Sequence, residues 1–171
     1  IVLRNLDVFR DYETIGKNLE QDPKISLVNP FVYSEVIVRS PKGTTGVAIK
    51  GVDAQHARKT PLSQYVDKDV FDRFAASTTS STSLPAILLG KDLQETLHVE
   101  VGDQVSVVSP YGGKDGQPKS QPFKVAGVFH SGMYEFDARM VFIPLSTAQD
   151  FFRLYNTVTG LEVWTHDSST S

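Results

Sequence analysis

The sequence contains no cysteine among its 171 residues. It can therefore form no disulfide, no thiolate metal site and no cysteine nucleophile, which fits a reducing compartment or an oxidising one where free thiols are avoided. It also has little net charge, because 17 Lys and Arg residues against 20 Asp and Glu residues leave −3 at pH 7, with a pI near 5.8. The composition thus gives no electrostatic reason to expect nucleic acid or an anionic membrane surface as a partner.

Long apolar runs are missing as well. The longest, such as Met140–Leu145, have the length of a strand, whereas a helix that crosses a bilayer needs roughly 20 apolar residues. There is no initiator methionine and no signal-peptide pattern, and the chain opens on Ile1–Arg4, a pattern typical of a strand. We therefore expect a domain excised from a longer protein, with a frayed polar tail at 168–171.

The chain has enough apolar residues, 40% of its length, for one compact domain or two small subdomains that share a core. Its first third predicts the order β-α-β-β from hydrophobic periodicity, turn residues and caps. The expected elements are a strand at 1–4, a helix capped by Asp7 and ending before Pro23, a strand over 25–38 interrupted at Asn29-Pro30, and a strand over 44–52.

The rest of the chain is richer in strands. The middle predicts helices over 65–76 and 90–97 and strands over 84–89, 104–108 and 123–129. Between them, Ser77–Ser83 lacks apolar side chains and helix formers, which favours a mobile surface connection. The last third predicts a strand over 139–145, a helix opened by Ser146 and Gln149 as a capping box, and a strand over 159–165. We predict an α+β fold with one layer built from both termini and a β-rich insertion between them.

The stretch Ser109–Phe123 contains glycines and lysines of the kind found in nucleotide-binding loops. A phosphate loop needs Gly-x4-Gly-Lys-Ser/Thr between a strand and a helix, so that backbone N–H groups and the helix dipole converge on the phosphate. Here the spacing fails, Pro118 lacks an N–H, and a strand follows instead of a helix. Gly90-Lys91 precedes a helix but lacks the upstream glycine and the hydroxyl residue. We therefore expect no nucleotide or other cofactor.

Candidate catalytic and metal-binding side chains are scattered along the chain. No histidine pairs with a carboxylate or a second histidine at ligand spacing, and no Gly-x-Ser-x-Gly elbow is present, so we expect neither a metal site nor a serine nucleophile. The paired carboxylates Glu135 and Asp137, like Asp67 and Asp69, are expected to be solvated charge. A soluble hydrolase or small-ligand domain would need a polar pocket lined by groups such as Glu135, Asp137 and His130. The histidines are His56, His98, His130 and His166.

The segment Ser131–Asp137 places a glycine, a methionine and two aromatic residues between two predicted strands, where polar turn residues would be expected. Two interpretations are open. The segment forms a buried link between subdomains, or it contacts a partner protein.

The order of several short motifs along the chain is distinctive. In this order they resemble the periplasmic domain of the LolC/LolE family, the permease subunits of the lipoprotein-releasing ABC transporter of Gram-negative bacteria. The resemblance runs over almost the whole chain. The motifs are Pro30–Val32, Gly51–Asp53, Leu88–Leu93, Val99–Asp103, Phe123–Phe129, Ser131–Asp137, Ile143–Leu145 with Ala148-Gln149, and Val158–Val163.

The resemblance implies a MacB-like periplasmic domain with two parts. A βαβ-type porter half would comprise 1–55 and 134–167, and an inserted β-rich sabre half would comprise 56–133. It also implies transmembrane helices at both ends of the native chain, an inner-membrane location with this domain in the periplasm, a paired permease subunit and a separate cytoplasmic ATPase subunit. The domain itself would be non-catalytic. In the family, the complex lifts lipoproteins from the inner membrane and passes them to the periplasmic chaperone LolA.

In the LolC branch of the family, a protruding hook in the inserted half engages the chaperone. By its position between two predicted strands, the hook corresponds here to 110–122, with prolines that reduce the ordering entropy lost on binding and polar side chains such as Lys119 and Gln121 near its base. A different partner is the alternative, in a MacB-like or FtsX-like ectodomain that couples a cytoplasmic ATPase to another periplasmic protein. The hook residues are Pro110, Tyr111, Gly112, Gly113, Lys114, Asp115, Gly116, Gln117, Pro118, Lys119, Ser120, Gln121 and Pro122.

Overall fold

The computed structural model describes residues 2–78, 83–110 and 116–166 of the chain. The strands in these ranges are β1 (Val2–Phe9), β2 (Ile25–Ser40), β3 (Gly43–Val52), β4 (Ala86–Gly90), β5 (Gln104–Ser109), β6 (Lys119–Phe129), β7 (Met140–Pro144) and β8 (Val158–Thr165). The helices are α1 (Tyr12–Glu20), α2 (Ala54–Ala57), the 3-10 helix η1 (Pro61–Gln64), α3 (Val70–Ala76), α4 (Lys91–Leu97), α5 (Tyr134–Arg139) and α6 (Leu145–Phe151). None of these helices has the length and apolar character that a membrane crossing requires. The predicted frayed tail at 168–171 and the centre of the predicted Ser/Thr connection lie outside the described residues.

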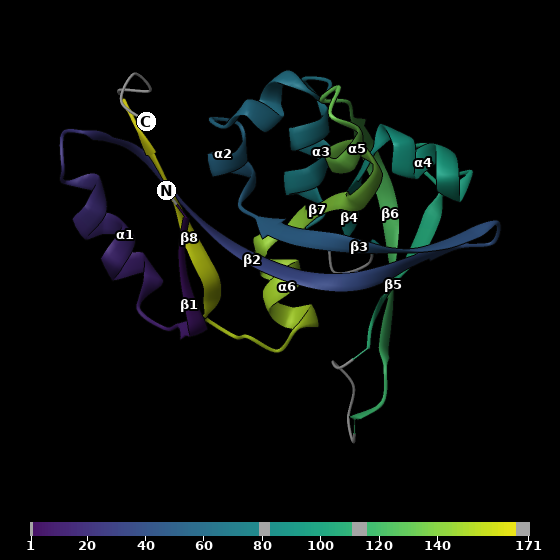
Figure 1. Ribbon diagram of the computed structural model, residues 1–171, viewed down its shortest axis with the longest axis horizontal. Helices are drawn as coiled ribbons and strands as arrows, with labels where there is room; N and C mark the ends of the chain where they lie inside the picture. Colours follow the sequence, from purple (N-terminus) through teal and green to yellow (C-terminus); the bar gives the residue numbers. More distant parts are fainter. Residues whose placement is uncertain (1, 79–82, 111–115, 167–171) are drawn as a thin grey trace.

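The strands in the described ranges form one hydrogen-bonded sheet in the order β1-β8-β2-β3-β7-β4-β6-β5. The longest strand, β2, pairs along one edge with β3 and along the other first with β8 and then, through Ile37–Arg39, with β5. This last pairing closes β2, β3, β7, β4, β6 and β5 into a ring. In Figure 1 β2 and β3 run side by side across the molecule, so β2 joins the terminal strands to the ring.

The two ends of the described chain lie near each other at one side of the molecule (Figure 1). There β1 pairs antiparallel with β8, and β8 pairs with the first half of β2. Helix α1 packs on β2 and β8 through Tyr12, Ile15 and Leu19. Further along, β3 of the N-terminal segment pairs in parallel with β7 of the C-terminal segment, from Ala48 opposite Met140 onward. The predicted α+β fold, with one layer built from both termini, is confirmed.

Both faces of the sheet are covered, because alternate residues of each strand enter different cores. In β2, Val28, Val32 and Val36 belong to a cluster that includes residues of α4 and α6. Phe31 points to the opposite face and belongs to a second cluster with residues of α2, α3 and β7. Strand β4, buried at every position, contributes to both clusters. This two-sided burial explains why β4 is a continuous apolar run rather than an alternating one.

Two predicted helix boundaries are wrong. Helix α1 begins at Tyr12 rather than after Asp7, because β1 continues to Phe9, which pairs with Val158 of β8. In the predicted helix over 65–76, only Val70–Ala76 is α-helical. In both places a tertiary contact replaces local helical hydrogen bonding. Near Asp7 it is the β1–β8 ladder. Near Tyr65 it is the hydrogen bond that the His130 N–H donates to the Tyr65 carbonyl oxygen.

The capping box predicted at the start of α6 is also wrong. The N-cap of α6 is Pro144, two residues before the predicted Ser146, so the Ser146 hydroxyl lies inside the first turn and caps nothing. The Gln149 side chain donates instead from Nε2 to the Thr157 carbonyl oxygen, 3.1 Å away. That hydrogen bond ties the helix to the chain that enters β8.

The predicted division into a porter half and a sabre half stays a prediction. One predicted boundary, at 55–56, falls within α2, and the other, at 133–134, falls at the start of α5. Strand β7 pairs on one edge with β3, which belongs to the same predicted half. On its other edge it pairs with Leu88 and Leu89 of β4, which belongs to the predicted inserted half. Any division of the chain at these points therefore leaves the sheet itself continuous.

Candidate functional site: a projecting hairpin and the groove beside it

Strands β5 and β6 form an antiparallel hairpin that extends away from the body of the molecule (Figure 1). The ladder runs from Gln104 opposite Lys124 to Ser109 opposite Lys119. On its other edge β5 pairs with β2, where Val108 lies opposite Ile37 and Ser106 opposite Arg39. The stalk, formed by β5 and Lys119–Phe123 of β6, is therefore supported by one further strand, β2, because the pairing of β6 with β4 begins only at Lys124.

The predicted hook is shorter than its sequence boundaries because β6 begins early. Lys119–Pro122, predicted as loop, already belong to the strand and pair with Ser106–Ser109. Of the residues before them, Gly116, Gln117 and Pro118 are exposed, and Gly116 has a φ of +74°, which favours glycine. Residues 111–115 lie outside the described part of the chain. The connection between the strands is therefore 110–118.

The Lys119 side chain connects the stalk to α6 by hydrogen bonds. Its Nζ donates to the carbonyl oxygens of Phe151, 2.9 Å away, and Asp150, 3.5 Å away, at the C-terminus of α6. It also lies 5.0 Å from the centre of the Phe151 ring. Burial lowers the pKa of Lys119, as does the nearby Arg153 charge, while Asp150 raises it. A cation at the end of a helix satisfies carbonyl groups that have no partner within the helix.

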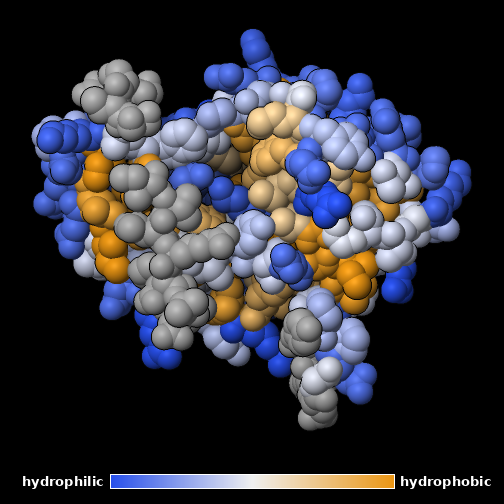
Figure 2. Space-filling view, viewed as in Figure 1, coloured by the Kyte–Doolittle hydropathy of each residue, from blue (hydrophilic) through white to orange (hydrophobic). Residues whose placement is uncertain are grey.

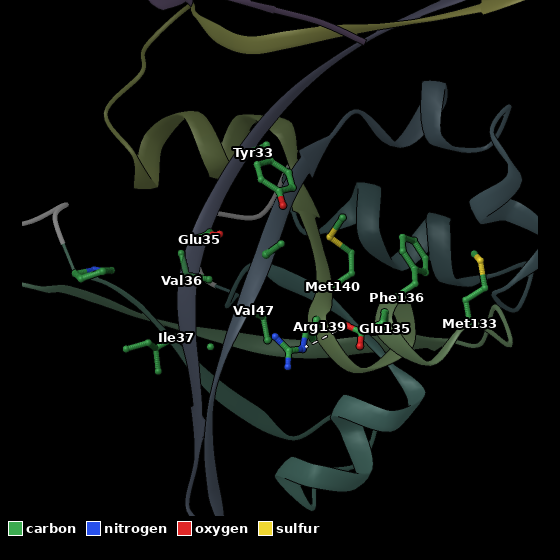
Figure 3. A pocket seen from close by; sticks show the side chains of 13 residues that line it. Tyr33, Glu35, Val36, Ile37, Val47, Met133, Glu135, Phe136, Arg139 and Met140 are labelled. Atoms are coloured by element: carbon green, nitrogen blue, oxygen red, sulfur yellow. Dashed lines mark ion pairs between the residues drawn. The ribbon is translucent and has the colours of Figure 1, made fainter. Parts of the chain in front are cut away.

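A groove of about 810 Å³ begins beside this hairpin, at Pro110, and follows the outer face of β2 and β3 to α5. Tyr33, Ile37 and Met140 are among its walls, which are mainly apolar. Figure 3 shows Met140, Phe136 and Met133 on the α5 side and Tyr33, Val36 and Ile37 on the side of the long strands. In Figure 2 hydrophobic side chains gather over this region, between β2, β3 and α5, within a largely hydrophilic surround.

Charged groups interrupt the apolar wall of the groove. Glu135 and Arg139 form an ion pair with 3.6 Å between Oε2 and Nε, and Glu35 lines the opposite wall. Both side chains of the pair are largely exposed, at 82% and 73%. An ion pair of this kind contributes little to stability, so these charges are free to meet a partner.

The buried carboxylate of Asp137 anchors the segment that forms one wall of the groove. Asp137 is 0% exposed. It accepts hydrogen bonds from the Ser131 backbone N–H (2.9 Å) and hydroxyl (2.7 Å) and from the Gly132 N–H (3.0 Å), and it lies 3.3 Å from Nδ1 of His130. Burial by itself raises the pKa of Asp137, but these hydrogen bonds and His130 outweigh it and lower the pKa below its usual value.

Gly90 allows α5 to lie this close to β4. A Cβ atom at Gly90 would stand 2.0 Å from the backbone carbonyl oxygen of Asp137. The anchored segment then presents Met133 and Tyr134 at the surface, 57% and 69% exposed. The exposure of two large apolar side chains on a fixed turn is typical of a contact surface.

Several predictions about titratable residues are wrong. Asp137 is buried rather than solvated, and it lies with Glu135 on a helix, where the two carboxylates point to different partners. Two histidines do pair with carboxylates: His130 with Asp137, and His56 with Asp53 at 3.0 Å. A buried acid with its partners five to seven residues upstream has no periodic signature, although Ser131-Gly132 is a typical source of N–H donors for a turn.

The polar pocket of Glu135, Asp137 and His130 that a hydrolase or small-ligand domain would need does not form in the described part of the chain. Asp137 turns into its own loop, whereas Glu135 faces Arg139 at the groove. Among the described residues, no three His, Asp or Glu side chains are grouped so that they could hold a metal ion.

Comparison with known proteins finds relatives in the family that the sequence motifs resemble. The chain is 26% identical over 156 residues to the lipoprotein-releasing system transmembrane protein LolC of Neisseria meningitidis, covering 90% of this chain and 36% of that protein. It is 25% identical over 157 residues to the corresponding LolE of Haemophilus influenzae, covering 89% of this chain and 36% of that protein. The chain thus spans about a third of these relatives, and the predicted resemblance to LolC and LolE is confirmed.

Solved structures share the fold at lower identity. The extracellular domain of the noncanonic ABC-type transporter YknZ from Gram-positive bacteria matches with a TM-score of 0.64 and 16% identity, over 96% of this chain and 76% of that one. The periplasmic region of MacB from Actinobacillus actinomycetemcomitans matches with a TM-score of 0.60 and 15% identity, over 99% of this chain and 69% of that one. The MacB-like periplasmic core domain matches residues 4–170. The chain therefore belongs to the family of MacB-like periplasmic core domains.

Proposed function

We propose that the chain is the periplasmic domain of an inner-membrane ABC transporter permease that releases lipoproteins, and that it hands them to the chaperone LolA through the hairpin at 110–122. The family match and the LolC and LolE relatives support the permease assignment. The observation that favours the hairpin is its construction: a two-stranded arm that leaves the body of the domain and carries the exposed residues Gly116, Gln117 and Pro118. The paired permease subunit and the ATPase subunit belong to the same proposal.

The support of the arm at its base favours this proposal. Its base is held on one edge by β2 and at Lys119 by α6, so binding need not order the stalk. A preformed element loses less conformational entropy on binding than a flexible one. The groove that starts at Pro110 adds apolar surface next to the arm, with Met133 at its far end. We propose that the partner contacts both the arm and this groove.

Deletion of the connection tests the arm. The variant replaces 110–118 with Asn-Gly, a two-residue turn suited to an antiparallel hairpin, so that Ser109 is joined closely to Lys119, which lies opposite it, and both strands remain. We expect the wild-type domain to form a complex with its cognate LolA in isothermal titration or light scattering, and the variant to bind at least ten-fold more weakly. Circular dichroism and thermal unfolding of the variant check that the domain still folds. Unchanged LolA binding would contradict the assignment of the arm.

A second candidate keeps the fold and changes the partner. The matched family is named for MacB, and a transporter from Gram-positive bacteria shares the fold, so a MacB-like or FtsX-like ectodomain with another extracytoplasmic partner fits the same comparisons. Co-purification of the full-length protein from its own membranes separates the two. Recovery of LolA after crosslinking supports the first candidate, and recovery of a membrane-fusion adaptor or a cell-wall hydrolase supports the second.

A further inference from the structure

A second pocket, of about 230 Å³, lies on the same face of the sheet as the groove. Its floor comes from β2, β3 and β8, and its cover comes from the α2–η1 segment and α5. Met133, Phe136 and Met140 line both spaces, so the pocket and the groove adjoin. Unlike the groove, the pocket contains buried polar atoms.

Strand register brings these polar side chains together from distant parts of the sequence. Asn29 of β2 lies opposite Glu162 of β8, and Trp164 is two residues further along β8. On the other edge of β2, Lys50 of β3 lies opposite Tyr33. Because side chains alternate along a strand, Asn29, Lys50, Glu162 and Trp164 all point to the face that forms the pocket.

Three of these side chains form a chain of polar contacts. Nζ of Lys50 lies 3.4 Å from Oε1 of Glu162, and Nδ2 of Asn29 donates to Oε2 of the same carboxylate, also at 3.4 Å. Only the NH2 end of an amide can donate to a carboxylate, so this contact fixes the orientation of the Asn29 side chain. Its carbonyl oxygen, Oδ1, therefore points away from Glu162.

Two buried atoms of residues that line this pocket have no hydrogen-bond partner among the described residues: Oδ1 of Asn29 and Nε1 of Trp164. Asn29 is only 2% exposed, so bulk water does not solvate its side chain. Buried polar atoms in native proteins nearly always have partners, because losing hydration without a replacement hydrogen bond destabilises the fold. One lone acceptor and one lone donor in the same pocket match a ligand that supplies one of each.

The charge balance and the apolar walls of the pocket indicate which kind of ligand it could bind. The Lys50–Glu162 pair balances its own charge, so the pocket favours a neutral group over an ion. Phe136, Phe142 and Leu62 form apolar walls around it, and the apolar groove adjoins it. An amide is a neutral group that supplies both partners from two separate atoms, an N–H donor and a C=O acceptor, whereas a hydroxyl group supplies both from a single oxygen. Pockets lined mainly by apolar side chains with a few placed polar groups are typical ligand sites.

We infer that this pocket binds a neutral amide group attached to an apolar body, with Oδ1 of Asn29 accepting from the amide N–H and Nε1 of Trp164 donating to its carbonyl oxygen. Such an amide is found in a peptide chain and at the head of an N-acyl chain. The inference does not depend on the proposed hand-off to LolA, because the pocket and the hairpin are built from different residues.

The only tryptophan of the chain is Trp164, so its fluorescence reports this pocket alone. The isolated domain is titrated with N-methylhexanamide as an N-acyl probe and with N-acetyl-leucine methylamide as a peptide probe. Methyl hexanoate, an ester of the same shape as the first probe but without the N–H, is the matched control. We expect a saturable change in Trp164 emission with at least one amide, and at least ten-fold weaker binding of the ester. Tighter binding of one amide assigns the source as acyl or peptide.

Substitution of Asn29 sharpens the test. In Asn29→Leu the acceptor is lost, and we expect affinity for N-methylhexanamide to fall to that of methyl hexanoate. The amide and ester comparison on the wild-type domain stands even if this variant does not fold. No saturable change with either amide would show a pocket that holds water only and would overturn the inference. An equal response to amide and ester would overturn it as well. Neither measurement contains LolA, so its result and that of the hairpin deletion are separable.

Discussion

The two ends of β6 are held in different ways. At its N-terminal end the chain joins a hairpin whose connection carries no apolar anchor in its described residues, and the stalk is fixed by neighbouring strands and by Lys119. At its C-terminal end the chain enters the segment 130–137, which is fixed from within by the Asp137 carboxylate. The first arrangement leaves Gly116, Gln117 and Pro118 exposed, whereas the second fixes a wall of the groove.

The two ends of β6 therefore differ in whether a substitution there should change the stability of the fold or only the position of the hairpin. Removing an internal anchor destabilises the fold, because buried donors lose their acceptor. Removing an external support such as the Lys119 side chain changes the position of the hairpin while the core remains packed. Substitutions at the C-terminal end of β6 should therefore affect stability most, and substitutions at its N-terminal end should affect binding most.

The largest effect is expected for Asp137→Ala. The Ser131 N–H, the Ser131 hydroxyl and the Gly132 N–H all lose their acceptor, and a buried space is left. We expect the free energy of unfolding to fall by about 3 to 4 kcal/mol, measured by urea denaturation. Glu135→Ala, on the exposed face of the same helix, is the matched control and should change it by less than about 0.5 kcal/mol. Equal effects of the two substitutions would contradict the anchor.

A similar but smaller loss is expected for Gly90→Ala. The new methyl group would stand 2.0 Å from the Asp137 carbonyl oxygen, so α5 must move away from β4. Overpacking of this kind costs about 2 to 3 kcal/mol. Gly46→Ala in β3 is the control, since a methyl group there meets nothing within 4 Å. Thermal unfolding should separate the two variants clearly, and a Gly90→Ala domain as stable as Gly46→Ala would show that α5 is not held against β4.

The sequence could predict much of the sheet but little of this anchor. Strands such as β3 and β5 have alternating or β-branched patterns that depend only on neighbouring residues, and both lie near their predicted positions. Asp137 has no such local signature, because its burial depends on the approach of β4 at Gly90, 47 positions earlier in the chain. The pairing of Asn29 with Glu162 likewise follows only once the β2–β8 register is known.

The hairpin illustrates a different limit. Its place between two strands was predictable from turn residues, but the start of β6 at Lys119 was not, because Ser120, Gln121 and Pro122 have no strand propensity of their own. Cross-strand pairing with β5 overrides that preference. A proline is tolerated at position 122 because this part of β6 lies at the edge of the sheet.

Acid should weaken the internal anchor before it affects the arm. The pKa of Asp137 is lowered in the folded protein, so the stability it contributes is present above the ordinary carboxyl pKa of about 4 and is lost as the pH falls through the lower, folded value. We expect the difference in unfolding free energy between wild type and Asp137→Asn to shrink progressively as the pH is lowered below about 4. Urea denaturation at a series of pH values measures it. A difference that stays constant to the lowest pH would show that the charge of Asp137 contributes no stability.

The smallest change in stability, about 1 kcal/mol, is expected for Lys119→Met, which keeps the aliphatic stem and loses the hydrogen bonds to the α6 carbonyl groups. Lys124→Met, at an exposed position of the same strand, is the control and should leave stability unchanged. Because Lys119 supports the stalk and not the core, its loss should weaken LolA binding by more than the stability change alone predicts, and Lys119→Arg should restore most of it. Titration of LolA into the wild-type, Lys119→Met, Lys124→Met and Lys119→Arg domains distinguishes the outcomes. If LolA affinity follows stability alone, Lys119 is only a packing residue. A selective loss of LolA affinity in Lys119→Met that arginine restores would show that LolA binding requires the arm to be held at its base.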